Sequence, residues 1–561
     1  MASSKEEEAK LVLFLQWLQI NEVELRGCNI KYSDSIKGFG IFSSENAPNG
    51  VLLVVPLDLA ITPMRVLQDP LLGPECRAML EEGEVDDRFL IILYLTLERL
   101  RKNSTWTPYL DMLPTKFGTP IWFSEDELLE LKGTSLYRAT ELQKKSLQRL
   151  YEDKVKKLVE KLLTLDDDTE REVSFEDFLW ANSIFWTRAL TIPYPHSSMP
   201  NIAQAEGSST GLVSGTNSEE TDYSCCDISI NCDDARKLSA DSHHPGVSST
   251  SDQVETTWVE GLVPGIDFCN HGLKPAATWE VDGTGSATGV PFSMYLLSAG
   301  HGAFSSGKEI SISYGNKGNE ELLYLYGFVM EHNPDDYLMI HYPIEAIENT
   351  PCSGSKVLLL EVQKVEFRCL LTKSLLDRGF FPPSVTEEDT KFPGNRLCNY
   401  SWSGERKMPS YLDKLVFPEE FMSALRTIAM TEDQTYQVSA LLEELVGSEG
   451  GRQPSDAEVR AAIWEACGDS GALQMLIDLL NTKVMDLEEG TGSEESDAEL
   501  LQKASCSEMI EKDQSKPETF CINPSRNQIS SIIYRKGQKE LARLFLKEAE
   551  YALELALSDG N

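Results

Sequence analysis

The sequence is short of positive charge. Its 561 residues include 51 Lys and Arg against 90 Asp and Glu, which gives a formal net charge of −39. Proteins that bind nucleic acids gain most of their non-specific affinity by neutralising phosphates with basic side chains. We therefore expect no direct contact with nucleic acid, and we expect a protein partner with a basic surface. The length leaves room for several cores, with three or four domains as a first expectation.

Long apolar runs are also missing. No stretch approaches the roughly 18 apolar residues that span a membrane, so we expect no membrane partner. The first residues, MASSKEEEAKLVLFLQWLQI, are acidic, and their apolar part is interrupted by Gln16. Signal peptides begin with basic residues and transit peptides avoid acidic ones. We expect neither kind of leader. We also expect a cytoplasmic or nuclear location and a monomeric protein.

Paired cysteines are a third absence. The twelve cysteines are scattered, which favours reduced thiols in the cytosol or nucleus. One group could bind zinc in principle, but it lacks C-x-x-C spacing and lies in a stretch rich in Ser, Asp and Gly. We interpret this group as incidental and expect no metal; it consists of Cys225, Cys226, Cys232, His243 and His244.

The most informative stretch runs from Gly261 to Phe328. It contains DFCNH at 267–271, SYG at 313–315 and LYGF at 325–328. Alternating apolar residues predict a strand over Glu309–Tyr314. Taken singly, none of these motifs is specific, because the histidine and the second tyrosine are equally typical of a protein core.

Two earlier segments add to this pattern. In KGFGIF at 37–42, glycines without Cβ let the backbone approach a ligand closely, although a tight turn explains a lone G-x-G equally well. The pattern SFEDFLWANSIFWTRAL predicts a helix over 174–190 that ends near Arg188. By itself, this arginine needs no role beyond neutralising the helix C-terminus.

In this order and spacing the motifs resemble the split-SET branch of the SET-domain protein methyltransferases, which includes the Rubisco large-subunit methyltransferase. The segments 29–56 and 104–134 add to the likeness, and IYRKGQ at 533–538 resembles the last helix of the substrate-binding domain of that branch. The resemblance implies an α+β fold: a SET domain of small β-sheets with a knot-like crossing and a helical insertion, followed by an all-α substrate-binding domain.

The expected organisation follows from this resemblance and from composition. After the motifs we expect helices over 357–377, 419–430, 434–445, 456–480 and 527–557. The acidic tract 486–499 is interpreted as a solubilising loop, with a docking patch for a basic partner as the alternative. The domains are an N-terminal helix (1–28), the first SET part (29–100), a helical insertion (101–195), a disordered acidic and Ser-rich insertion (196–256), the C-terminal SET part (257–335) and the helical substrate-binding domain (336–561).

The resemblance also implies the cofactor, S-adenosylmethionine, and a role for each site residue. The family often has an acidic residue at the position of Lys37, so a side-chain contact there differs while backbone contacts remain. Tyr314 and Tyr326 are the catalytic residues by resemblance. The cofactor-binding residues are Lys37, Gly38, Phe39, Gly40, Arg188, Asn270 and His271, and the substrate-binding residues are Arg188, Asp267, Tyr314 and Tyr326.

These residue types suit methyl transfer to an amine. The reaction is an in-line displacement, so catalysis depends mainly on alignment. A lysine acceptor, whose pKa is about 10.4 in water, must also lose its proton, and desolvation next to a cationic sulfonium favours that loss. The Tyr314 hydroxyl can orient the methyl through weak C–H···O contacts, and the Tyr326 ring can form a wall of the lysine channel.

We therefore expect a protein-lysine N-methyltransferase. One alternative is a protein-histidine N-methyltransferase, whose acceptor ring must be held by hydrogen bonds. The histidine branch has polar or aromatic residues where this chain has Leu190 and Ile266, which cannot form side-chain hydrogen bonds. The other alternative is a catalytically silent SET scaffold, which would have no need of Asn270, His271 and Tyr314.

Overall fold

The structure is a computed structural model. It describes residues 5–34, 37–44, 50–83, 85–166, 172–195, 256–299, 307–382, 409–446, 452–511 and 524–558. The expected disordered insertion (196–256) lies outside these ranges except for its last residue, as do the five Cys and His residues considered for zinc. In the described ranges, no helix is both long and apolar enough to cross a membrane.

The chain divides into two compact units. The first comprises residues 1–121 and 139–316, and the second comprises residues 122–138 and 317–561. Helix α7 (Ser135–Leu150) belongs to both because the division falls within it. This division follows packing, whereas the domain bounds given above follow sequence likeness and stay predictions.

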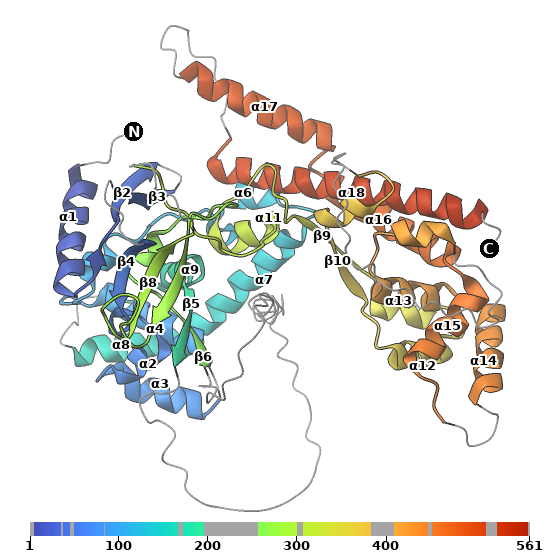
Figure 1. Ribbon diagram of the computed structural model, residues 1–561, viewed down its shortest axis with the longest axis horizontal. Helices are drawn as coiled ribbons and strands as arrows, with labels where there is room; N and C mark the ends of the chain where they lie inside the picture. Colours follow the sequence, from blue (N-terminus) through green and yellow to red (C-terminus); the bar gives the residue numbers. More distant parts are fainter. Residues whose placement is uncertain are drawn as a thin grey trace, which may run out of the picture. The chain divides into compact units, whose positions relative to one another are not determined.

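The first unit is built on a four-stranded antiparallel sheet. Its order is β1 (Glu24–Leu25), β4 (Val51–Pro56), β8 (Ser293–Ser298) and β7 (Ala277–Asp282), so two distant parts of the chain meet at its centre (Figure 1). Leu52 to Val55 are completely buried, which explains why β4 has an unbroken apolar sequence. Two further pairs complete the strands, β2 (Cys28–Asp34) with β3 (Gly38–Ser43) and β5 (Leu190–Pro195) with β6 (Thr256–Gly261).

Two helices of the first unit were expected. The predicted N-terminal helix contains α1 (Lys5–Ile20), and the helix predicted over 174–190 is α9 (Phe175–Arg188), which packs against the apolar helix α4 (Asp87–Leu100). Ser174 caps α9 through a capping box with Asp177. The others are α2 (Pro63–Gln68), α3 (Leu72–Glu81), α5 (Thr107–Leu110) and α8 (Lys156–Leu165).

The prediction of a regular strand over Glu309–Tyr314 is wrong. This segment forms two isolated bridges instead, one antiparallel to Phe42 and one parallel to His271. Ile310 and Ile312 are buried, so the alternation is real, but their backbone N–H groups donate to opposite neighbours: Ile41 O at 2.7 Å and Asn270 O at 3.0 Å. The segment therefore passes between the glycine-rich hairpin, formed by β2 and β3, and the DFCNH segment.

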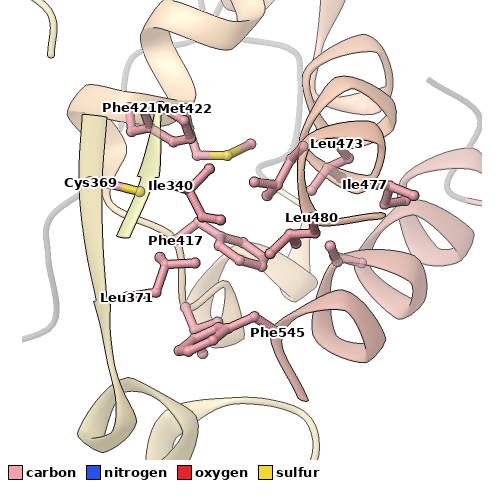
Figure 2. Close-up of a cluster of buried hydrophobic side chains, with 14 of the residues drawn as sticks. Ile340, Cys369, Leu371, Phe417, Phe421, Met422, Leu473, Ile477, Leu480 and Phe545 are labelled. Atoms are coloured by element: carbon pink, nitrogen blue, oxygen red, sulfur yellow. The ribbon is translucent and has the colours of Figure 1, made fainter. Parts of the chain in front are cut away.

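The second unit is mainly helical and also contains a two-stranded sheet. Strand β9 (Tyr337–His341) pairs with β10 (Arg368–Thr372), and alternate residues of both strands enter the core. Figure 2 shows Ile340, Cys369 and Leu371 from this sheet facing Phe417 and Phe545. The principal helices are α12 (Ser353–Gln363), α13 (Glu419–Ala429), α14 (Glu432–Val446), α15 (Asp456–Cys467), α16 (Ser470–Glu488), α17 (Glu494–Glu511) and α18 (Arg526–Ser558).

Two predicted helices need correction. The helix expected over 357–377 ends at Gln363, because Lys364 has φ +48° and the β10 strand follows. The helix expected over 456–480 is two helices separated at Gly468, whose φ is +57°. Helices α13, α14 and α18 lie where they were predicted.

The interpretation of residues 486–499 as a solubilising loop is wrong. The tract contains the end of α16 and the start of α17, and the Asp497 side chain is completely buried. This carboxylate accepts from Arg535 Nη2 at 2.6 Å and from Lys539 Nζ at 2.7 Å. The acidic tract is therefore joined to α18 by a buried ion-pair network, and the IYRKGQ motif supplies one of its cations.

Candidate active site

Arg188 and Asp267 meet in the first unit, and Tyr109 joins them. Asp267 lies in the turn Ile266–Phe268, which follows Gly265 with its φ of +106°. The Asp267 carboxylate accepts from Tyr109 Oη at 2.7 Å and from the Gly265 N–H at 3.0 Å. Arg188, the last residue of α9, donates to the Asp267 carbonyl at 2.9 Å and lies 3.5 Å from the carboxylate.

Burial controls the electrostatics of this group. It raises the pKa of the Asp267 carboxyl, while the Arg188 guanidinium and the Tyr109 hydroxyl oppose the rise. Burial and the neighbouring carboxylate raise the pKa of Tyr109 well above its usual value. Arg188 also lies over the Phe268 ring, 4.8 Å from its centroid. Arg188 thus contacts residues of the DFCNH segment, so it does more than neutralise the C-terminus of α9.

Lys37, Gly40 and Asn270 also meet, through a residue that the motifs did not single out. Glu309 accepts from Asn270 Nδ2 at 2.7 Å with one carboxylate oxygen and from Lys37 Nζ at 2.8 Å with the other. A Cβ at Gly40 would lie 2.9 Å from both Asn270 Nδ2 and Glu309 Oε1. A side chain at position 40 would therefore have to displace this contact between Asn270 and Glu309.

The other residues of the hairpin have different surroundings. Gly38 has φ +70°, and a Cβ there would meet no atom within 4 Å. The Phe39 ring packs edge-on against Tyr32, with centroids 5.6 Å apart. The open space at Gly38 leaves room for a ligand to approach the backbone there.

Two hydrogen bonds fix Tyr314, one from its backbone to His271 and one from its hydroxyl to Cys269. The Tyr314 N–H donates to His271 Nδ1 at 3.1 Å, and the Tyr314 hydroxyl donates to the Cys269 carbonyl at 2.8 Å. Because Nδ1 accepts a hydrogen bond, a neutral His271 carries its proton on Nε2. Burial raises the pKa of the Cys269 thiol well above its usual value, so this thiol is unsuited to act as a nucleophile.

Tyr326 belongs to the second unit. It ends the π-helical turn Leu322–Tyr326, which is closed by Gly327 in the left-handed region, and its ring lies 6.4 Å from that of Phe328. Asn319 supports the start of this turn by donating to the Met330 carbonyl at 2.8 Å and to Asp336 at 3.0 Å. The role of Tyr326 as a wall of the lysine channel stays a prediction.

Tyr109 and Glu309 are the two site residues that sequence reasoning missed. Tyr109 lies in the segment 104–134, which contributed only to the family likeness, and Glu309 is the first residue of the predicted strand Glu309–Tyr314. Each is an isolated polar group next to buried apolar residues, which is the signal that could have marked it. Within the described ranges, no group of three His, Cys, Asp or Glu residues is placed to hold a metal ion.

The fold is shared with solved structures. The SET domain of LSMT bound to lysine and AdoHcy matches 98% of this chain and 93% of its own, with a TM-score of 0.58 and 19% identity. Rubisco LSMT bound to AdoMet matches with a TM-score of 0.57 and 18% identity. The chain has the SET-domain fold of Rubisco LSMT. The fold and the family likeness that the motifs predicted are thereby confirmed.

Sequence comparison agrees over a smaller part of the chain, and no protein-family model matches. The [fructose-bisphosphate aldolase]-lysine N-methyltransferase of Arabidopsis thaliana is 30% identical over 193 residues, and the Rubisco large-subunit N-methyltransferase of Pisum sativum is 29% identical over 180. This LSMT-like chain covers 38% and 35% of their lengths. The human actin-histidine N-methyltransferase is 27% identical over 199 residues.

Proposed function

We propose that this LSMT-like chain is an S-adenosylmethionine-dependent protein-lysine N-methyltransferase. The observation that carries the proposal is the fixed position of Tyr314, held at its backbone by His271 and at its hydroxyl by Cys269. A scaffold has no need to aim a tyrosine hydroxyl. The two plant relatives bear the names of lysine methyltransferases, and the matched solved structures contain AdoMet, AdoHcy, lysine or methyllysine.

The first unit offers groups that fit the cofactor. The open space at Gly38, next to Phe39, and the amide oxygen of Asn270 suit its polar amino-acid end. The backbone of His271 suits the adenine, and Arg188 lies beside the same segment. Bound S-adenosylmethionine supplies an electrophilic methyl group on a sulfonium.

Tyr314 has the geometry to orient that methyl group. Because its hydroxyl hydrogen is donated to the Cys269 carbonyl, its oxygen keeps lone pairs that can accept weak C–H···O contacts. The acceptor lysine loses its proton more easily in a desolvated channel next to a cation. We assign the channel wall to Tyr326 and the placement of the acceptor to Arg188 and Asp267.

The residues near Arg188 and Asp267 favour lysine over histidine as the acceptor. Leu190 begins β5, Ile266 precedes Asp267, and both are buried, with exposures of 9% and 0%. Neither side chain can hold an imidazole by a hydrogen bond. An apolar environment suits the alkyl chain of lysine and disfavours its charged form. Histidine methylation, the activity in the name of the actin-histidine relatives, is the alternative.

Calorimetry and product mapping test the proposal. Titration of the full chain with S-adenosylmethionine should give saturable binding that Asn270→Ala weakens by at least about tenfold, because a partly buried polar partner of the ligand is lost. Lysate proteins exposed to the enzyme and labelled cofactor should carry methyl groups on lysine in fragmentation spectra. Folded protein without binding at millimolar cofactor would favour the scaffold, and methyl groups found only on imidazole nitrogens would favour the histidine alternative.

The remaining expectations accompany this proposal. A protein substrate with a basic surface fits the net charge of −39. A monomeric state and a cytoplasmic or nuclear location stay predictions.

A further inference from the structure

One carboxylate in the first unit bridges two residues of the cofactor site. Glu309 uses one oxygen for Asn270 Nδ2 and the other for Lys37 Nζ, at 2.7 and 2.8 Å. The side chain of Glu309 is 21% exposed and that of Lys37 is 45% exposed. The Asn270 bond therefore lies on the inner side of the bridge, and the lysine lies on its solvent side.

The bond from Asn270 fixes which way its amide points. An asparagine side chain has a donor end and an acceptor end, and a rotation of 180° exchanges them. A hydrogen bond to an ionised acceptor is about twice as strong as one between neutral groups. With its NH₂ group held by Glu309, Asn270 presents its oxygen in the opposite direction, where it can accept from a cationic amino group.

The surrounding backbone keeps Glu309 in place. The Ile310 N–H donates to Ile41 O at 2.7 Å, and the Ser43 N–H donates to Lys308 O at 2.9 Å, so Glu309 lies between two hydrogen bonds to the hairpin. The absence of a side chain at Gly40 leaves just enough space for the contact between Asn270 and Glu309. Hairpin, carboxylate and amide thus fit together closely.

We propose that Glu309 is a positioning residue of the cofactor site. It orients Asn270 so that the amide oxygen accepts from the α-ammonium group of S-adenosylmethionine, and Lys37 balances the charge of Glu309 from the solvent side. The inference rests on the proposed function. It also gives the side chain of Lys37 a role where the resembling family often has an acidic residue.

The experiment measures the dissociation constant for S-adenosylmethionine by calorimetry on the full chain. Glu309→Ala should raise it by about tenfold or more, because Asn270 loses a charged partner. Glu309→Gln keeps an acceptor and should raise it less. Lys37→Met should raise it only about two- to fivefold, because an exposed ion pair contributes little.

The matched control is Glu260→Ala, which removes another half-exposed carboxylate of the first unit, ion-paired with Arg88. It should leave the dissociation constant within about twofold, because exposed pairs contribute little. With a substrate in hand, Glu309→Ala should raise the KM for the cofactor while kcat at saturating cofactor changes by less than about twofold. That split is the signature of lost binding, which a general loss of structure does not produce.

A double-mutant cycle separates positioning from other effects. If Glu309 acts through Asn270, adding Glu309→Ala to Asn270→Ala should change the dissociation constant by less than about twofold. The inference would be overturned if Glu309→Ala raised the dissociation constant equally in the wild type and in Asn270→Ala. It would also be overturned if Glu309→Ala bound the cofactor with wild-type affinity. If Glu309→Ala is unfolded in a thermal scan, Glu309→Gln replaces it in the cycle with the same criteria. Failure of the wild-type protein to bind the cofactor would instead refute the proposed function.

Discussion

Tyr109→Phe tests how the buried Asp267 carboxylate is stabilised. Tyr109 is completely buried, and its ring lies against Phe14 and Trp106, with centroids 6.1 and 6.3 Å away. Phenylalanine keeps these apolar contacts, so the substitution removes only the hydroxyl that donates to Asp267 at 2.7 Å. Loss of a hydrogen bond to a charged group costs about 1.5–3 kcal/mol. For a domain of this size the unfolding temperature should fall by roughly 3–12 °C.

The stability lost in Tyr109→Phe should also depend on pH. Burial raises the pKa of Asp267 above its unfolded value. The contribution of the protonated carboxyl group to the free energy of unfolding is therefore present at low pH and is lost as the pH rises through the folded pKa. The Tyr109 hydroxyl opposes that rise, and Tyr109→Phe therefore moves the folded pKa further up. Below about pH 4 both proteins carry a neutral Asp267, and the difference in stability should be smallest there. It should grow as the pH increases through the folded pKa.

The assay is a series of thermal unfolding scans of wild type and variant from acid to neutral pH. Tyr295→Phe is the matched control, because its hydroxyl donates to Glu280 at 2.6 Å, where the carboxylate is exposed to water. Its cost should stay below about 1 kcal/mol, since water replaces the lost donor. A Tyr109→Phe protein as stable as the control, or one whose deficit stays constant with pH, would refute the reasoning.

Two further predictions concern turnover and the helical unit. Tyr314→Phe should bind S-adenosylmethionine within about threefold of wild type and lose most of its turnover, because it removes only the Tyr314 hydroxyl, which donates to the Cys269 carbonyl. Unchanged turnover in a labelled-cofactor assay would exclude the catalytic role. Asp497→Asn should destabilise the second unit by about 3–5 kcal/mol, because Arg535 and Lys539 then lack their buried counter-charge. Urea unfolding measures this loss, and a change below about 1 kcal/mol would contradict it.

The sequence predicted helices well where local signals agreed. The apolar pattern over 174–190 predicted helix α9, and the Ser174 and Asp177 side chains cap its start. Both features act within a few residues. Alternation over Glu309–Tyr314 was equally clear, but it reports only which side chains are buried. It could not reveal that the backbone of this segment forms hydrogen bonds to strand β3 on one side and to Asn270 on the other.

The same limit applies to the candidate site. Arg188, Asn270 and Tyr314 were predicted because the order of motifs in the resembling family links them, whereas their partners were not predicted. Tyr109 is 158 positions from Asp267, and Lys37 is 272 positions from Glu309. No periodicity connects residues so far apart, so such pairs follow only from the folded chain.

Charge runs were misjudged for a related reason. A run of acidic residues was interpreted as solvated because burial of a lone carboxylate is costly. In the structure, Asp497 is buried because Arg535 and Lys539, four residues apart on one face of α18, both reach it. The spacing of these two cations was visible in the sequence, and the acidic group that they neutralise was not.

The arrangement around residues 267–271 determines how substitutions must be interpreted. Within five residues, Asp267 contacts Arg188, Cys269 and His271 hold Tyr314, and Asn270 binds Glu309. The groups that would bind the cofactor and orient the methyl therefore share one short piece of backbone. A change at one position shifts its neighbours, and effects of contacting residues do not add. Loss of turnover in a single variant of this segment thus identifies a catalytic group only when the cofactor affinity of the same variant is unchanged, which is why binding and turnover have to be measured on each protein.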